Sequence, residues 1–430
     1  MRPRGSGRAG AVLVAAVVLL GGCSSDLLTT TAPAGESPGT AGEGGGGTGI
    51  SEDAANVDPA LVDELARLSE RAVSEYDLMA LLVKVTQGGR DVYEAAFGET
   101  MTGVPATTDM HFRNGAFAFT YIGQAFARMA DEGLLSLEDP LSTWRPDLPE
   151  ADRITIRMLL NMTSGYADYV YTPDVLDGTQ ADPFRQWTGP ELTEIGVSRP
   201  MWFEPGTNWA YSHTNYVILG DVLSKITGRS TAEALEEYVV QPMGLTQTTG
   251  NDDTPLIPEP VLQSYTSERR TFLQVPADVP FYEDSTYWNP SWTTAPGAVQ
   301  TSTIDDVTRS MEIVGSGAQV SPEMYEQQTG ANLVGQGTPP TEQCPRCGPL
   351  TEERNYGLGV IRYGPWIANT KLFAGSGATG GYLPEGEWAI TVVTTYLPSA
   401  FGPDGGFDNA SATIWAELAA AVSPDNAPRV

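Results

Sequence analysis

Three cysteines and two histidines carry the most distinctive chemistry of this 430-residue chain. Two of the cysteines, Cys344 and Cys347, lie close together in a polar loop that is rich in Gly and Pro. A zinc site would need two more ligands, and a thioredoxin-like redox motif needs a strand–helix setting that this loop lacks. Outside the cytoplasm, this spacing therefore predicts a local disulfide. Because His111 and His213 are the only histidines, we expect no histidine-rich metal site and no cofactor.

The third cysteine, Cys23, follows a segment with the features of an export signal. Arg2, Arg4 and Arg8 precede an apolar run, residues 11–20, that is too short for a typical membrane span. The sequence Leu-Gly-Gly-Cys at residues 20–23 resembles the lipobox of bacterial lipoproteins. This resemblance implies that residues 1–22 are a lipoprotein signal peptide and that Cys23 is lipidated. The expected location is outside the cytoplasm, anchored to the bacterial cell membrane; the alternative is an ordinary signal peptide with an incidental cysteine.

Composition limits the classes of partner. The chain has 54 acidic and 24 basic residues and a formal net charge of -30. The electrostatic field of this negative charge repels the phosphate backbone of DNA and RNA, so nucleic acid is not an expected partner. Hydrophobic residues make up 41% of the chain, which is sufficient for a large folded core.

The elements that must position any site begin after a flexible region. Residues 23–56 are rich in Gly, Thr, Ser, Ala and Pro and are expected to form a tether. Order is expected over residues 57–425, starting with a helix capped by Asp58 with Pro59 at its first position. Two strand-like runs follow, residues 81–85 and 92–97, and the Gly88-Gly89 pair between them predicts a hairpin.

The rest of the domain is predicted to be helical in its middle and to return to strands at its end. Helices are expected over residues 116–132, 215–227 and 409–422, and strands over 356–361, 371–373 and 388–396. Asp305 and Asp306 are expected to cap a further helix and to form part of its first turn. The order of elements predicts an α/β (α+β) fold with one antiparallel sheet built from both chain ends, residues 57–110 and 350–425, and a helical region over 111–349.

Several motifs in the same order resemble the β-lactamase-related serine hydrolases, a family that includes class C β-lactamases, DD-peptidases and esterases. The segments that carry the resemblance are residues 112–141, 154–165, 203–207, 211–213, 220–228, 241–245 and 356–359. The resemblance covers about residues 61–418. It implies a β-lactamase/transpeptidase-like fold, in which an antiparallel sheet flanked by terminal helices meets an all-helical region across the active cleft.

The residues that perform the family's chemistry are missing. The family acts through Ser-x-x-Lys at the start of a helix, where the serine attacks a carbonyl and the lysine helps to move its proton. Ala116 and Phe119 stand at these two positions. Ala116 has no oxygen with which to attack, and Phe119 has no titratable group. Phe119, with Phe117, is expected either to fill the cleft or to pack in the core.

The family's other two motifs are also altered. Tyr211 matches the tyrosine of Tyr-x-Asn, but His213 stands where the asparagine would be. The Lys-Thr-Gly or His-Thr-Gly motif is replaced by Gly375, Ser376 and Gly377, so its cationic or imidazole side chain is absent. These changes favour a non-catalytic relative that binds a peptide, a peptidoglycan fragment or an envelope protein.

The alternative is a serine hydrolase with a relocated nucleophile. The resemblance places both Ser376 and His213 on the cleft, and a serine beside an imidazole is the minimum for an activated nucleophile. The sequence shows no third partner for either residue. Their ordinary roles would be a strand-edge hydroxyl and a hydrogen-bonded loop histidine.

Overall fold

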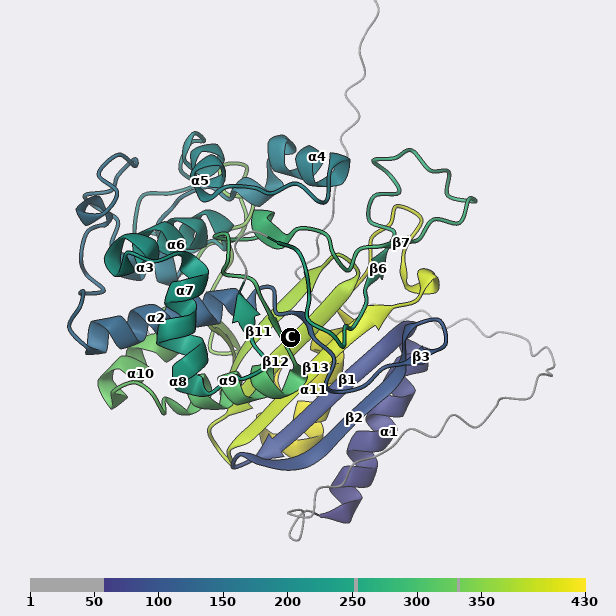
Figure 1. The fold of residues 1–430 in the computed structure, drawn as a ribbon. Helices are drawn as coiled ribbons and strands as arrows, with labels where there is room; N and C mark the ends of the chain where they lie inside the picture. The colour runs from purple at the N-terminus through teal and green to yellow at the C-terminus, as the bar shows by residue number, and fades with distance from the viewer. Residues whose placement is uncertain (1–57, 251–253, 331–332) are drawn as a thin grey trace, which may run out of the picture. The chain divides into compact units, whose positions relative to one another are not determined.

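An eight-stranded antiparallel sheet forms the centre of the fold (Figure 1), in the order β3-β2-β1-β13-β12-β11-β10-β9. Its first strands are β1 (Leu78–Gln87), β2 (Arg90–Met101) and β3 (Val104–Pro105). The others follow the helical part of the chain: β9 (Arg354–Tyr356), β10 (Ile361–Tyr363), β11 (Trp366–Phe373), β12 (Ser376–Leu383) and β13 (Trp388–Tyr396). The two chain ends meet where β1 pairs with β13, with Val83 opposite Val392. The predicted fold class is therefore confirmed.

The computed structural model describes residues 58–250, 254–330 and 333–430. All of these residues belong to one unit, residues 43–430. The predicted signal peptide, Cys23 and the whole predicted tether, residues 23–56, lie outside the described residues. Among the helices of the described part, none has the length and apolarity needed to cross a bilayer.

Both faces of the sheet are covered, which explains the nearly continuous apolar run of β1. Helices α1 (Pro59–Glu75) and α11 (Ala410–Val422) pack on one face, where Leu81 and Val83 point. Helix α9 (Ile304–Ser316) packs on the other face, with Ala80 and Leu82. The predicted start of α1 is confirmed, because Asp58 accepts a hydrogen bond from the amide of Ala60 at 2.9 Å.

The helical region packs around α2 (Phe117–Asp131) and α6 (His213–Thr227). Every residue of α2 from Phe117 to Ala127 is buried, so this helix is a core element rather than an amphipathic surface helix. The other helices are α3 (Ile156–Leu160), α4 (Pro173–Ala181), α5 (Gly189–Val197), α7 (Thr231–Leu235), α8 (Gln241–Met243) and α10 (Pro322–Thr329). Small sheets are formed by β4 (Phe112–Arg113), β8 (Gln300–Ser302) and β5 (Thr249–Gly250), and by β6 (Tyr265–Thr266) and β7 (Glu283–Asp284).

Two predicted elements need correction. The strand expected over residues 356–361 is a turn between β9 and β10, in which Gly359 has φ +80°. A side chain at Gly359 would meet the carbonyl oxygen of Phe119 at 2.2 Å, so the chain must turn here to pass α2. At α9 the cap is Thr303, whose hydroxyl accepts from the Asp306 amide, and Asp305 and Asp306 both lie in the first turn.

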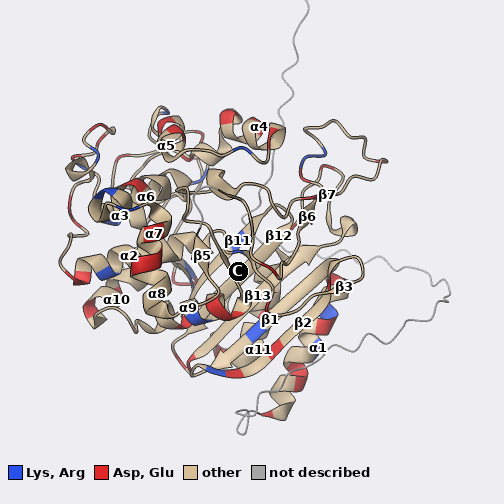
Figure 2. Cartoon of the chain, viewed as in Figure 1, with Lys and Arg blue, Asp and Glu red and all other residues tan. Residues whose placement is uncertain are grey.

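Acidic side chains are spread over outer helices such as α1, α4 and α10 (Figure 2). Basic side chains also occur inside the sheet layer. Lys84 on β1 is buried and forms ion pairs with Asp91, Glu94 and Asp305. These pairs raise the pKa of Lys84 above its ordinary value against the opposing effect of burial.

Candidate functional site

Ala116 stands at the start of α2, where the resemblance expects the nucleophile. It is the residue before the first helical position, its side chain makes no capping hydrogen bond, and it is partly exposed. Its carbonyl oxygen accepts a hydrogen bond from the side-chain amide nitrogen, Nδ2, of Asn369 on β11 at 3.0 Å. The start of α2 is therefore held against β11, and a methyl group stands where the resemblance expects the reactive hydroxyl.

Phe119 stands where the resemblance expects the family's lysine. Its side chain is only 2% exposed, and its ring stacks on Tyr216 at a centroid distance of 4.1 Å. The rings of Tyr211 and His213 lie 5.6 and 5.7 Å away. Phe119 is thus part of the hydrophobic core of the helical region. Phe117 belongs to a separate core beside the sheet. An amine at this position would be surrounded by aromatic rings.

Tyr211 occupies the expected place next to this aromatic cluster. It contacts the ring of His213 at 5.2 Å and the ring of Tyr356 at 6.2 Å, both edge to face. Burial raises the pKa of Tyr211 well above its ordinary value. Its phenol is therefore harder to ionise than that of an exposed tyrosine.

His213 has a partner that the sequence did not reveal. Its Nδ1 lies 2.8 Å from a carboxylate oxygen of Asp168, whose side chain is fully buried, while the histidine side chain is 18% exposed. Asp168 also accepts the amide of Val170 as the cap of a short 3₁₀ turn. The only signal in the sequence was a single acid in the apolar stretch between Asp152 and Asp174. The arrangement fixes the ring of His213.

Gly375, where the resemblance expects the third-motif cation, stands in a tight turn. The turn between β11 and β12 consists of Ala374 and Gly375, with φ values of +53° and +70°, as in the tight turns of two-residue hairpins. A Cβ on Gly375 would lie 1.8 Å from the carbonyl oxygen of Tyr265. No side chain can fit at Gly375 in this arrangement. Gly377 follows inside β12, where a Cβ would meet Asn409 and Thr394 at 2.8 Å.

A lysine from the neighbouring strand corrects the expectation that a cation is absent here. Lys371 of β11 donates a hydrogen bond from Nζ to the Oγ of Ser376 at 2.8 Å. Its stem packs against Gly115, where an added Cβ would meet the Lys371 Cδ at 2.8 Å, so it lies beside Ala116. The residues are 4% and 7% exposed. Lys371 and Ser376 are diagonal neighbours on the two strands of a hairpin with a two-residue turn. The sequence could predict this contact only if residues 376–383 were assigned as a strand.

The surroundings of Lys371 favour its neutral form. Burial, followed by the charge of nearby Arg113, lowers the pKa of Lys371 to about 7. Nζ lies 5.8 Å from the ring centroid of Phe112 and 5.2 Å from that of Phe373, and no carboxylate of the described residues forms an ion pair with it. A lysine amine with a pKa near neutrality can accept a proton from a serine hydroxyl.

The predicted pair of Ser376 and His213 is not joined by a hydrogen bond in the described part of the chain. Ser376 is bonded to Lys371, and His213 is bonded to Asp168. The structure therefore contains two separate polar pairs in place of one serine–histidine pair.

The disulfide prediction is confirmed. Cys344 and Cys347 are bonded to each other with a Cα–Cα distance of 5.4 Å. Both are 3% exposed, and Cys347 forms a β-bridge with Ala210, which precedes Tyr211. Arg346 lies over the ring of Tyr171 at 3.6 Å. The disulfide loop therefore supports the segment that carries Tyr211 and His213.

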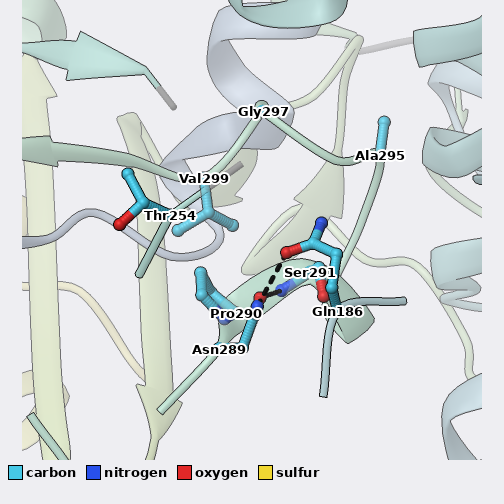
Figure 3. Close-up of a pocket in the computed structure, with 8 residues that line it drawn as sticks. All are labelled: Gln186, Thr254, Asn289, Pro290, Ser291, Ala295, Gly297 and Val299. Atoms are coloured by element: carbon cyan, nitrogen blue, oxygen red, sulfur yellow. Dashed lines mark hydrogen bonds between the residues drawn. The ribbon is translucent and has the colours of Figure 1, made fainter. Parts of the chain in front are cut away.

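Two pockets lie away from these polar pairs. The first, shown in Figure 3, has a volume of about 10 Å³, and its lining includes Asn289, Gln186 and Val299. Asn289 donates to Gln186 at 2.7 Å, and the space left is about that of one water. The second has a volume of about 320 Å³ and is lined by Arg113, Thr301 and neighbours from β5 and residues 254–258.

Comparisons with known proteins agree with this fold. The chain is 27% identical to Esterase EstB of Burkholderia gladioli over 314 residues, which cover 67% of this chain and 78% of the esterase. It is 32% identical to Penicillin-binding protein 4 of Amycolatopsis lactamdurans over 165 residues, 36% of this chain but only 41% of that protein. A penicillin-binding protein of Bacillus subtilis (strain 168) is matched over only 37% of its length.

Solved structures show the same fold at lower sequence identity. The D-amino acid amidase from Ochrobactrum anthropi SV3 superposes with a TM-score of 0.68 at 20% identity, covering 84% of this chain and 99% of the amidase. A D-stereospecific amidohydrolase from Streptomyces sp. gives a TM-score of 0.65 at 22% identity, covering 83% and 98%. Residues 65–412 match the Beta-lactamase family. This match spans most of the chain, and the chain therefore belongs to the Beta-lactamase family.

Proposed function

We propose that this chain is a lipid-anchored protein of the bacterial cell envelope that binds a ligand or partner without acyl transfer at the family's serine position. The observation that carries the proposal is the pair Ala116 and Phe119: a methyl group replaces the nucleophile, and a buried ring replaces the amine. Removal of a hydrolase nucleophile lowers turnover on the order of a million-fold. By family analogy, the ligand is a peptide, a peptidoglycan fragment or an envelope protein.

The test is covalent labelling of the purified full chain with a fluorescent penicillin and with a fluorophosphonate. We expect no adduct at any serine under conditions that label an active serine hydrolase fully. An adduct that forms at an enzymatic rate would refute the proposal. Peptide mapping by mass spectrometry then identifies the labelled serine, with Ser376→Ala as the matched variant.

A second candidate function follows from the hydrogen bond between Lys371 and Ser376. In this mechanism the neutral Lys371 amine takes the hydroxyl proton as the Ser376 oxygen adds to a substrate carbonyl. The protonated lysine then gives that proton to the leaving group, and water hydrolyses the acyl-serine. This candidate ranks second because both residues are buried and their turn lies under Tyr265 and Ser285.

The two candidates differ in which substitution matters. If Ser376 is the nucleophile, Ser376→Ala and Lys371→Met each abolish labelling and hydrolysis. His213→Ala retains most of the activity, because His213 is bonded to Asp168 rather than to Ser376. Activity that survives Ser376→Ala would remove this candidate.

The anchor is part of the proposal and has its own test. Cys23→Ser removes the acceptor for lipidation, so the protein should move from the membrane fraction to the soluble extracytoplasmic fraction, since no described helix can hold it in a bilayer. The double variant Cys344→Ser/Cys347→Ser is the matched control and should remain in the membrane fraction. Retention of Cys23→Ser in the membrane would contradict a lipid anchor at Cys23.

A further inference from the structure

Arg113 is a buried cation without an anionic partner in the described part of the chain. It lies on β4 and is 7% exposed. One guanidinium nitrogen donates to the carbonyl oxygen of Pro255, and Nε has no hydrogen-bond partner. No carboxylate of the described residues forms an ion pair with it, although acids outnumber bases 54 to 24 in this chain.

A buried charge of this kind is unfavourable unless it is compensated. Burial lowers the pKa of Arg113 to about 10, and its charge in turn contributes to the lowered pKa of Lys371. Arg113 therefore lies near the buried Lys371, and no acid of the described residues forms an ion pair with either side chain. A bound anion would supply the compensation that the described residues do not.

Arg113 lines the pocket of about 320 Å³ together with three hydroxyl side chains, those of Thr249, Thr254 and Thr301. Across the small sheet, Arg113 of β4 is opposite Thr301 of β8, and Thr301 is opposite Thr249 of β5. Residues in one register row of adjacent strands point to the same face. The pocket thus has one edge made of a guanidinium and two hydroxyls.

Apart from Thr254, the rest of the pocket wall is apolar. Leu256, Ile257 and Val299 line it, and Leu256 is 66% exposed although it is a large hydrophobic residue. A pocket of this size with apolar walls and a few convergent polar groups is typical of small-molecule sites. It has room for an apolar group attached to the anion.

We propose that this pocket binds a small monocarboxylate that carries an apolar substituent, with the carboxylate on Arg113 and the hydroxyls of Thr301 and Thr249, and the substituent against Leu256, Ile257 and Val299. The guanidinium fork matches the geometry of a carboxylate. A single cation at the pocket matches one negative charge rather than the two of a phosphate. The inference gives the proposed binding function a ligand class, but it does not require acyl transfer to be lost.

The test is calorimetric titration of the purified full chain with N-acetylleucine and with N-acetylleucinamide, which differ only in the carboxylate. We expect N-acetylleucine to bind and the amide to bind at least about tenfold more weakly, the fold-change expected from one charge-assisted contact. Arg113→Met should weaken N-acetylleucine binding by at least about tenfold. Inorganic phosphate should bind more weakly than N-acetylleucine.

The matched control is Arg270→Met. Arg270 is also buried, at 8% exposure, and also donates to a proline carbonyl, that of Pro276, but it does not line the pocket. The Arg270→Met substitution should change the Kd for N-acetylleucine by no more than about twofold. If Arg113→Met fails to fold by circular dichroism, Thr301→Val keeps the side-chain shape and removes one polar contact, and it should weaken binding about threefold or more.

Three results would overturn the inference. They are an absence of N-acetylleucine binding to folded wild-type protein up to roughly 20 mM, equal binding by wild type and folded Arg113→Met, and tighter binding of inorganic phosphate than of N-acetylleucine. Penicillin labelling of the same preparation is a separate readout. A failure of carboxylate binding leaves the labelling result unchanged, and a serine adduct leaves the binding result unchanged.

Discussion

The two sides of Ala116 differ in the kind of side chain that surrounds it. On the helix side, which we define by Phe119, Tyr211 and Tyr216, aromatic rings pack against one another. On the sheet side, which we define by Lys371 and Ser376, an amine and a hydroxyl lie within hydrogen-bond distance.

The difference follows from the cost of burying a charge. A lysine at position 119 would lie among rings, with no carboxylate of the described residues in place to pair with it. Lys371 is just as buried, but the depressed pKa allows it to be neutral near pH 7. The comparison teaches that the sheet side contributes an amine and a hydroxyl next to Ala116, whereas the helix side contributes aromatic packing and the hydrogen-bonded pair of His213 and Asp168.

The largest expected effect is on the helix side. Phe119→Ala should lower the free energy of unfolding by about 3–5 kcal/mol, because it removes a buried ring that stacks on Tyr216. Urea denaturation followed by circular dichroism measures the change. The control is Phe184→Ala, at a ring that is 59% exposed, which should change stability by less than about 0.5 kcal/mol. Equal effects of the two substitutions would contradict a packing role for Phe119.

The next effect is a pH dependence on the sheet side. The folded pKa of Lys371, about 7, lies below the unfolded value of about 10.4. Between these values the unfolded chain holds a proton that the folded chain has released, so stability rises with pH. Relative to Lys371→Met, wild type should gain about 2–3 kcal/mol between pH 7 and pH 9. Urea titrations at several pH values measure this difference.

Lys84 is the matched control for this pH dependence because it is a buried lysine of the same sheet with a raised pKa. For a raised pKa, the stabilising contribution is complete below the unfolded pKa and is lost only as pH rises through the folded pKa. The difference between wild type and Lys84→Met should therefore be flat from pH 7 to pH 9. A flat difference for Lys371→Met as well would show that Lys371 stays charged.

The smallest effect tests the support of the helix side. Cys344→Ser/Cys347→Ser opens a short closed loop, and the chain-entropy model gives a loss of about 2 kcal/mol for a loop of this length. Cys347 lies against Ala210, the residue before Tyr211 on the helix side. Loss of the disulfide should therefore leave unchanged the pH dependence of stability that Lys371 causes on the sheet side. A change in that slope would show that the two sides are coupled, and unaltered stability would show that the disulfide does not support the fold.

Local patterns predicted much of the fold. Turn residues predicted the hairpin at Gly88 and Gly89, a capping residue predicted the start of α1 at Asp58, and an apolar run predicted the strand Trp388–Tyr396. Each of these signals acts within a few positions of the chain. The strand expected over residues 356–361 was wrong because Gly359 turns to pass the backbone of Phe119. That constraint lies 240 residues away in the chain.

The sequence by itself determined which groups are missing, because the identity of Ala116 and Phe119 excludes a serine nucleophile and a lysine there whatever the packing. Only the tertiary structure decided which groups remain together. Lys371 reaches Ser376 through the register of one hairpin, and Asp168 reaches His213 through the packing of a loop on α6. Burial and charge proximity depend on contacts between distant segments, so the lowered pKa of Lys371 and the lack of an ion pair between Arg113 and any described acid emerge only after folding.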